Sequence, residues 1–326
     1  MCVICQDDYH SRDVIDCGHC MSLTKIPVIP GLKSLICSNC KNLTEISVIP
    51  GLEELSCAWC ISLKTIPIIP GLKKLRCLEC TGLKTIPVIP GLQELDCNGC
   101  SNLEEISNIP GLKELKCCEC TRLTTIPVIP GLRNLHCSYC TSLTVIPYIP
   151  GLKKLSCQTC TSITEIPLID GLKLLDCFNC QKLTKIPVIP GLKELYCWSC
   201  TSLKEIPIIP NLKELDCWGC VSLTEIPFIP GLRRLLCDEC RRLTHIPDIP
   251  NLELRCYNCP WVSQNDEFKE NVMNLIKIQK HVKKYHKFKI CKRWVESDYF
   301  REWYYHPEGP GGMKAVLRLI KKTKNE

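Results

Sequence analysis

The stretch Ile66–Cys80, which reads IPIIPGLKKLRCLEC, is one copy of a unit that recurs every 20 residues over residues 17–259. The unit can be written I-P-x-I-P-G-L-x-x-L-x-C-x-x-C-x-x-L-x-x. Its spacing holds without a slip until the last pair, Cys256 and Cys259, which arrives one residue early. Because an internal repeat outweighs chain length as a guide to architecture, we expect the 326 residues to form a repetitive array rather than ordinary domains.

Each half of the unit predicts a local structure. Side chains alternate along a strand, so Leu75 and Cys77 would face the buried side of a short strand. The two prolines in Ile66–Pro70 exclude a helix interior or a central strand and favour an extended, polyproline-like return. The position of Gly71 holds glycine in every unit except two, where asparagine replaces it. These residue types tolerate positive φ, which predicts a tight left-handed turn there.

The pattern L-x-x-L-x-C-x-x-C-x-x-L resembles the signature of leucine-rich repeats. In the quoted unit, the family's positions are held by Leu72, Leu75, Cys77, Cys80 and Leu83. The I-P-x-I-P half resembles a 20-residue bacterial subclass, and the whole pattern resembles repeat proteins encoded by giant DNA viruses of protists. The resemblance implies a right-handed solenoid over residues 26–259, with about 12 repeats, a concave parallel β-sheet and an extended convex side.

The paired cysteines of each unit admit three interpretations. In the first, the leading cysteine, such as Cys77, is a small core residue, and the second, such as Cys80, caps loop backbone. In the other two, equivalent cysteines of stacked turns, about 5 Å apart, bind metal or form disulfides. The first interpretation is favoured because no CxxC pair stands out from the rest.

The composition bears on the compartment. Thirty cysteines would suit a small secreted disulfide scaffold, but this chain is long, and its first residues show neither a basic start nor an apolar run. We therefore expect no secretory signal, no membrane span and mostly reduced thiols. The expected location is cytoplasmic, or the host cytoplasm if the protein is viral.

The opening segment, residues 1–25, is expected to cap the array. Four of its residues resemble the first four ligand positions of a RING finger: Cys2, Cys5, Cys17 and His19. The resemblance implies a ubiquitin ligase that binds two zinc ions. The family's third ligand pair is missing, because Ser22 stands where a cysteine is expected.

Two further interpretations of this segment remain open. One is a single tetrahedral Zn²⁺ site formed by Cys2, Cys5, Cys17 and Cys20, with His19 as an alternative ligand. In the other, Cys17 and Cys20 are ordinary repeat cysteines and the preceding residues are a frayed cap.

The exposed strand positions of each unit, equivalent to 73, 74, 76, 78 and 79, hold mostly charged residues. In three consecutive units one of these positions is aromatic, and it holds Phe178, Trp198 and Trp218. Tyr196 lies one strand position away, and two aspartates, Asp176 and Asp216, flank the aromatic residues. Exposed aromatic residues side by side on a rigid sheet are typical of a protein-binding hot spot. The alternative is a self-stacked ladder that only stabilises the fold.

Residues 260–326 differ from the array in composition. They carry 15 Lys and Arg and 8 Asp and Glu, a net charge of +7. This equals the net charge of the whole chain. Periodicity predicts a helix over about 265–285, a short one begun at Ser297, and a basic one over Met313–Lys322. This small α-helical segment would cover the last leucines of the array, and its basic face would suit an acidic partner.

Sequence motifs for catalysis are missing. There is no phosphate-cradling glycine-rich loop, nucleophile elbow or HExxH, and no strong nucleic-acid or membrane signal. We therefore expect a scaffold that binds a protein partner on the concave face of the solenoid. The alternative is a ubiquitin ligase-like adaptor whose repeats select the substrate.

Overall fold

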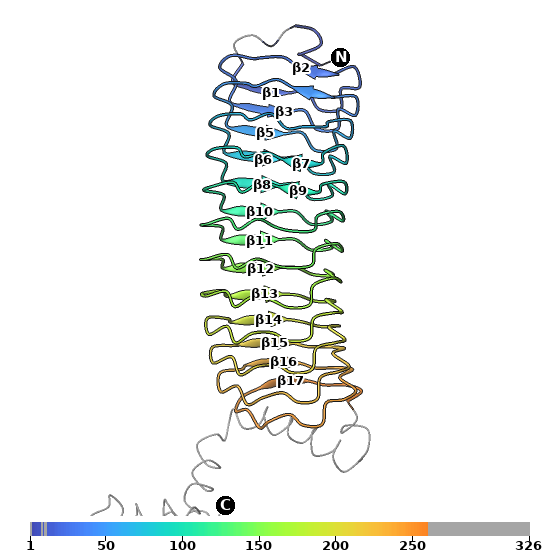
Figure 1. Cartoon of the computed structure of the whole chain (residues 1–326), viewed down its shortest axis with the longest axis vertical. Helices are drawn as coiled ribbons and strands as arrows, with labels where there is room; N and C mark the ends of the chain where they lie inside the picture. Colours follow the sequence, from blue (N-terminus) through green and yellow to red (C-terminus); the bar gives the residue numbers. More distant parts are fainter. Residues whose placement is uncertain (1, 8, 10–11, 260–326) are drawn as a thin grey trace, which may run out of the picture. The chain divides into compact units, whose positions relative to one another are not determined.

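The computed structural model describes residues 2–7, 9 and 12–259, which form a coil of stacked parallel strands (Figure 1). One face is a thirteen-stranded parallel sheet whose strands follow one another in chain order. The strands of this sheet are β1 (Val14–Asp16), β3 (Ser34–Ile36), β5 (Glu54–Ser56), β6 (Lys74–Arg76), β8 (Glu94–Asp96), β10 (Glu114–Lys116), β11 (Asn134–His136), β12 (Lys154–Ser156), β13 (Leu174–Asp176), β14 (Glu194–Tyr196), β15 (Glu214–Asp216), β16 (Arg234–Leu236) and β17 (Glu253–Arg255).

The register of the sheet follows the repeat. Leu55 of β5 pairs with Leu75 of β6, and the same offset of 20 residues holds from β1 to β16. At the last step Leu235 pairs with Leu254, an offset of 19, which absorbs the shortened final unit. The predicted parallel β-solenoid is therefore confirmed, with each residue stacked on its equivalent in the next coil.

The core is a column of apolar side chains from every coil. In one coil, seven side chains are fully buried: Leu72, Leu75, Cys77, Cys80, Leu83, Ile86 and Ile89. Burying each leucine or isoleucine contributes about 1.5–3 kcal/mol. Each coil packs these side chains against the coils on either side, so a single unit would not hold this core alone.

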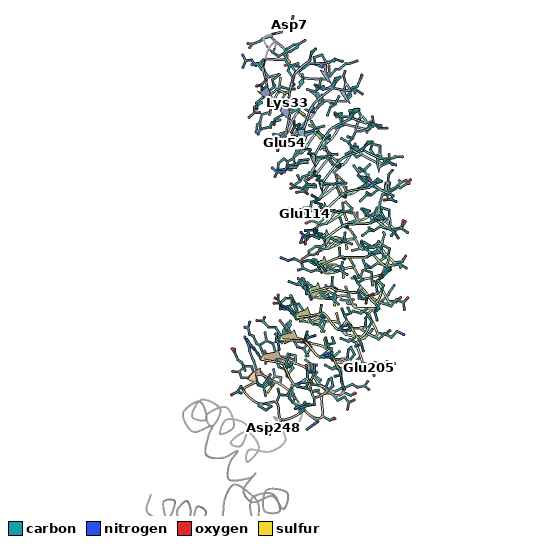
Figure 2. All side chains as sticks on the ribbon, turned by 90° about the vertical axis from the view of Figure 1, so that its left-hand side faces the viewer. Asp7, Lys33, Glu54, Glu114, Glu205 and Asp248 are labelled. Carbon is teal, nitrogen blue, oxygen red and sulfur yellow. The ribbon has the colours of Figure 1, made fainter. Side chains whose placement is uncertain are left out.

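The return side of each coil is extended, as predicted from its prolines. It contains two short parallel pairs, β2 (Lys25–Ile26) with β4 (Glu45–Ile46), and β7 (Thr85–Ile86) with β9 (Glu105–Ile106). No helix occurs within residues 12–259. In Figure 2 the described array is curved, with Glu54 and Glu114 of the large sheet on its concave side and Glu205 of the return on its convex side.

Most coils use left-handed backbone at two turns. The predicted one occurs at Gly71, where φ is 90°, and at Asn251, where φ is 61°, but Gly191, Asn211 and Gly231 in three consecutive coils are not left-handed. Asn211 instead donates its side-chain amide to the carbonyl oxygen of Pro190 over 2.8 Å. The second left-handed position lies inside the CxxC turn, for example at Trp59, and was not predicted because residues of many types occupy it.

The large sheet begins inside the segment assigned to the N-terminal cap, since β1 lies within residues 1–25 and pairs with β3. By its contacts the chain separates into two units, Met1–Asn265 and Asp266–Glu326. The helices expected in residues 260–326 lie outside the described residues. Among the residues that are described, no helix is long and apolar enough to cross a membrane.

Candidate functional site

The aromatic column lies in the turns that follow three strands, not on the strands themselves. Strands β13, β14 and β15 end at Asp176, Tyr196 and Asp216, and the aromatic residues follow two positions later. The CxxC segment turns away from the strand direction there. The backbone still stacks in order, because Asn179 donates its N–H to the carbonyl oxygen of Trp198 over 2.8 Å. The three aromatic residues therefore sit on a rigid edge of the sheet.

The three rings are not equivalent. Phe178 and Trp198 stack face to face, with ring centroids 3.9 Å apart and planes 3° apart. Trp218 is tilted by 56° against Trp198, with centroids 5.7 Å apart, and is 41% exposed. The Phe178–Trp198 pair is the self-stacked ladder that stabilises the turns. Trp218 ends that ladder and presents its ring to solvent.

The two aspartates beside the column hold its backbone in place. The Oδ1 atom of Asp216 accepts the N–H of Trp218 over 3.1 Å, and that of Asp176 accepts the N–H of Phe178 over 3.5 Å. Asp176 also accepts the side-chain amide of Gln158. Burial raises the pKa of both carboxyls above the ordinary range, against the effect of these hydrogen bonds. Their positions suit orientation of the aromatic residues.

Tyr196 stands between the two aspartates in the strand register and is held by two carboxylates. Its hydroxyl lies 3.3 Å from an oxygen of Glu194 and 3.2 Å from an oxygen of Glu214. Burial and the charges of these glutamates raise the pKa of Tyr196 to about 12. The phenol therefore stays protonated at neutral pH and donates to this carboxylate pair.

A column of basic residues runs along the amino ends of the strands, opposite the aromatic turns, and it was not predicted from the sequence. At the position just before seven consecutive strands stand Lys113, Arg133, Lys153, Lys173, Lys193, Lys213 and Arg233. Each after Lys113 donates its backbone N–H to the carbonyl oxygen of the one before, at 2.8–2.9 Å, so the column is continuous. Lys33, which holds the same position in an earlier coil, lies on the concave side in Figure 2. Comparing the charges at equivalent positions of successive units, rather than along the chain, would have revealed this basic column.

These seven cations are not neutralised within the described array. None of them forms an ion pair there, and most are exposed. Neighbouring strands lie about 4.8 Å apart, and like charges directly opposite one another destabilise a sheet. The basic column is therefore a mostly exposed row of positive charge.

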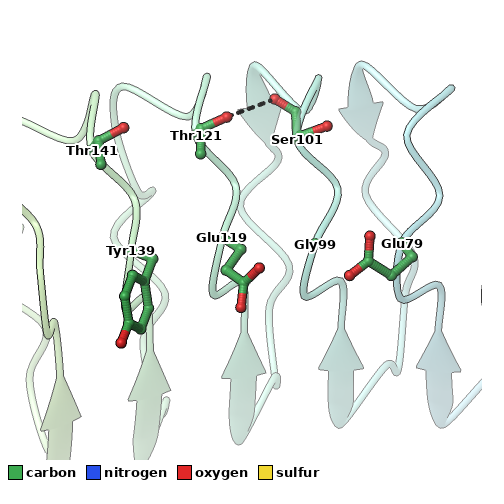
Figure 3. Close-up of a pocket in the computed structure, with 7 residues that line it drawn as sticks. All are labelled: Glu79, Gly99, Ser101, Glu119, Thr121, Tyr139 and Thr141. Atoms are coloured by element: carbon green, nitrogen blue, oxygen red, sulfur yellow. Dashed lines mark hydrogen bonds between the residues drawn. The ribbon is translucent and has the colours of Figure 1, made fainter.

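A shallow groove of about 470 Å³ lies on the turn edge of the earlier coils (Figure 3). Glu79 and Glu119 flank Gly99, and Tyr139 closes the row. A Cβ atom at Gly99 would meet the Glu79 carboxylate, which would have to move, and the φ of Gly99 is left-handed at 73°. Tyr139 is 44% exposed, and Trp59, at the same position of the unit four coils earlier, is 51% exposed.

The cysteine ladder has the structural role favoured from the sequence. The second cysteine of each pair donates its thiol to the carbonyl oxygen of the first cysteine one coil earlier, as Cys80 does to Cys57 over 2.9 Å. The leading cysteines are buried, and hydrogen bonding to the Cys100 thiol together with burial raises the pKa of Cys77 well above the ordinary value. All cysteines of the described residues are free thiols.

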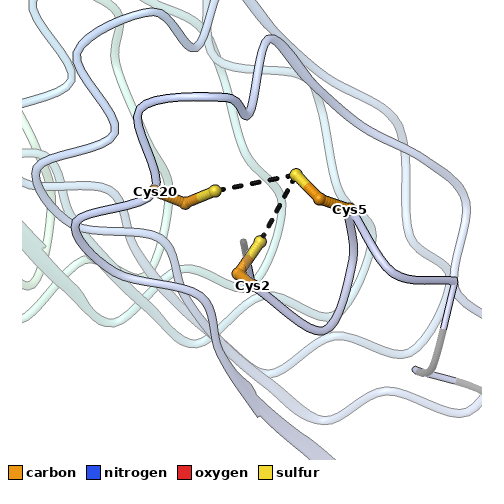
Figure 4. A group of neighbouring side chains, drawn as sticks. All are labelled: Cys2, Cys5 and Cys20. Carbon is orange, nitrogen blue, oxygen red and sulfur yellow. Dashed lines mark hydrogen bonds between the residues drawn. The ribbon is translucent and has the colours of Figure 1, made fainter.

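Three of the four cysteines predicted to bind zinc come together at the start of the array (Figure 4). The sulfur atoms of Cys2 and Cys5 lie 3.7 Å apart, those of Cys5 and Cys20 lie 3.6 Å apart, and all three lie within 4.8 Å of one another. Burial raises the pKa of Cys5 to about 11. Although burial also acts on Cys20, hydrogen bonds from Cys2, Cys5 and Ser22 lower the pKa of Cys20 to about 7.

Cys17 and His19 are not part of this group. Cys17 is 1% exposed in the core, where burial raises its pKa far above the ordinary value. His19 is exposed in a left-handed turn, and its Nδ1 lies 2.9 Å from the side-chain amide of Asn39. Among the described residues, the only group of His, Cys, Asp or Glu ligands placed to hold a metal is Cys2, Cys5 and Cys20.

An apolar stripe on the return side was also missed. The residue between the two Ile-Pro pairs of each unit points outward, as Ile68 does with 52% exposure. Ten coils place an exposed apolar or aromatic side chain there: Val28, Val48, Ile68, Val88, Val128, Tyr148, Leu168, Val188, Ile208 and Phe228. Asn108 interrupts the stripe, and Asp248 ends it.

The strand register and the buried leucine positions define a parallel β-solenoid that resembles leucine-rich repeat proteins. No protein-family model and no curated protein matches the chain. Among solved structures, a leucine-rich repeat protein from Bacteroides ovatus is 19% identical, with 72% of this chain and 81% of that chain covered and a TM-score of 0.40. A leucine-rich cell surface protein from Faecalibacterium prausnitzii is 17% identical, with 72% and 82% covered and a TM-score of 0.40.

An internalin from Listeria monocytogenes is 15% identical, with 73% of this chain and 87% of that chain covered and a TM-score of 0.22. At these TM-scores the likenesses add nothing to the fold assignment, which rests on the repeat register of the chain itself.

Proposed function

We propose that the protein is a non-enzymatic interaction scaffold that binds a protein partner on the concave face of its solenoid. The observation that carries the proposal is the exposed Trp218 ring at the end of the Phe178–Trp198 stack. A tryptophan held rigidly by its neighbours loses little conformational entropy on binding, which is why such residues dominate interface energies. Asp176 and Asp216 support this anchor by holding the turns at Phe178 and Trp218, and Tyr196 lies between them in the strand register.

The basic column indicates which chemistry the partner's surface would have. The partner would present an apolar or aromatic side chain to Trp218 and an acidic segment to the cations from Lys113 to Arg233. Complementary charge of this kind mainly speeds association and sets orientation, whereas the buried aromatic contact slows dissociation. Because the cysteines of the array are free thiols, the protein and such a partner would meet in a reducing compartment such as the cytoplasm.

Affinity capture with the intact chain tests the proposal. A partner captured by the wild-type chain should lose affinity by about 30-fold when Trp218 is changed to alanine, which is the ~2 kcal/mol expected of a hot-spot residue. Trp59→Ala is the matched control, because Trp59 is exposed in an equivalent turn far along the array. It should leave the affinity unchanged.

A second pair of variants tests the basic column. Lys173→Ala combined with Lys193→Ala should weaken binding and make it less sensitive to salt, since exposed charges act over a Debye length of about 8–10 Å. Partners captured equally well by wild-type, Trp218→Ala and the double lysine variant would exclude this surface. Each variant's thermal unfolding is compared with wild type, so that loss of fold is not taken for loss of binding.

A further inference from the structure

We propose that the thiols of Cys2, Cys5 and Cys20 bind one zinc ion, with one coordination position left to a ligand from solvent. The group lies outside the proposed partner surface, and the two hypotheses are independent. It differs from both ligand sets predicted from the sequence, because neither Cys17 nor His19 takes part.

The spacing of the sulfur atoms fits a metal ion. A tetrahedral zinc–thiolate site with Zn–S bonds of about 2.3 Å places neighbouring sulfur atoms about 3.8 Å apart. The observed separations are 3.7 Å between Cys2 and Cys5 and 3.6 Å between Cys5 and Cys20. A disulfide would need about 2.05 Å, so these two pairs are spaced as metal ligands rather than as bonded sulfur atoms, and the sulfur atoms of Cys2 and Cys20 lie within 4.8 Å of each other.

The place of Cys20 in the ladder explains why its thiol is available. In the next coil, the Cys40 thiol donates to the carbonyl oxygen of Cys17 over 3.2 Å. The residues described before β1 form turns and not a further coil, so these described residues offer no equivalent carbonyl one coil before Cys20. Cys2 and Cys5 approach at this end instead. The three-thiol group therefore occurs where the repeat breaks. No other cysteine pair of the described ladder belongs to a group of three ligands placed to hold a metal.

The chain around the three-thiol group is already partly ordered against the core. Ile4 is 8% exposed, and Cys2, Cys5 and Tyr9 pack on the first coil. A bound ion would join residues 2–5 to Cys20 and close the open end of the solenoid, which every repeat array needs. Each thiol that binds releases its proton to the buffer, and zinc is neither oxidised nor reduced. The open position distinguishes this site from a closed structural site with four protein ligands.

The experiment uses the full chain, purified under reducing conditions and stripped of metal. Titration with Zn²⁺ followed by elemental analysis should give one ion per chain, and Co²⁺ should give thiolate-to-cobalt charge-transfer bands that saturate at one equivalent. Cys5→Ser should abolish both signals. Cys118→Ser is the matched control, because Cys118 is a half-buried free thiol outside the ladder and should leave both unchanged.

Alkylation with mass-spectrometric mapping gives a second readout that needs no substitution. Zn²⁺ should slow modification of Cys2 and Cys5 at least tenfold and leave Cys118 unaffected. The three-thiol site is overturned if the wild-type chain retains no ion after desalting, if Cys118→Ser lowers binding as much as Cys5→Ser, or if Zn²⁺ protects none of the three thiols. Cys17→Ala tests the ligand set, and loss of the ion from a folded Cys17→Ala chain would overturn it in favour of four cysteines.

Discussion

The thiol of Cys80 donates a hydrogen bond to the backbone carbonyl oxygen of Cys57, 2.9 Å away in the preceding coil. The same bond recurs along the array, from Cys40 with Cys17 to Cys259 with Cys237, at 3.2 Å in both cases. A sulfhydryl is a weak donor, and the Cys57 carbonyl oxygen also accepts the backbone N–H of Cys60 over 3.3 Å. The repeated cysteine therefore adds a hydrogen bond to one backbone carbonyl per coil.

Changing Cys80 to alanine should remove one of two hydrogen bonds at the Cys57 carbonyl oxygen, because the N–H of Cys60 also donates to it over 3.3 Å. The expected cost is about 0.5–1.5 kcal/mol, the net contribution of a typical hydrogen bond. Cys77→Ala removes the same sulfur from a fully buried position that caps no carbonyl, and should cost less. Urea denaturation of the two variants gives the comparison, and equal losses would show that packing, not capping, explains the second cysteine.

Changing Asp216 to asparagine should raise the unfolding temperature at pH 7. Burial raises the folded pKa of this carboxyl, so its ionisation disfavours the folded state, and its contribution falls as pH rises through that pKa. Asparagine keeps an oxygen for the Trp218 N–H and removes the charge. The gain should shrink towards pH 3, where the aspartate is itself protonated.

Thermal unfolding of wild type and Asp216→Asn, each at pH 3 and pH 7, measures this difference. Glu165→Gln is the control, since Glu165 is exposed and should give similar small changes at both pH values. A gain for Asp216→Asn that is larger at pH 3 than at pH 7 would contradict the sign of the argument.

Core and stripe positions of one coil should respond very differently to truncation. Leu75 is fully buried, and Leu75→Ala should cost about 2–5 kcal/mol, as cavities in packed cores do. Ile68 is 52% exposed, and Ile68→Ala should change the free energy of unfolding by no more than about 0.5 kcal/mol. Denaturation midpoints measure both, and a large loss at Ile68 would mean that the apolar stripe belongs to the core.

The repeat itself determined the fold of this protein. In a solenoid each coil contacts only its neighbours, so a 20-residue period already states which residues stack, as Leu55 does on Leu75. The prolines determined the extended return, and the uniform CxxC pairs indicated a structural ladder. These inferences needed only the local backbone restrictions of proline and the 20-residue period, and both can be read directly from the amino-acid sequence.

The tertiary structure decided how side chains meet across coils and at the end of the array. It placed Trp218 in the turn beyond β15, where backbone hydrogen bonds join the coils, and it tilted the Trp218 ring by 56° against Trp198. It also brought Cys20, and not Cys17, to Cys2 and Cys5. Spacing in the sequence cannot make that choice, because Cys17 and Cys20 are both near enough along the chain. The direction of each side chain selects Cys20, since Cys17 faces the core.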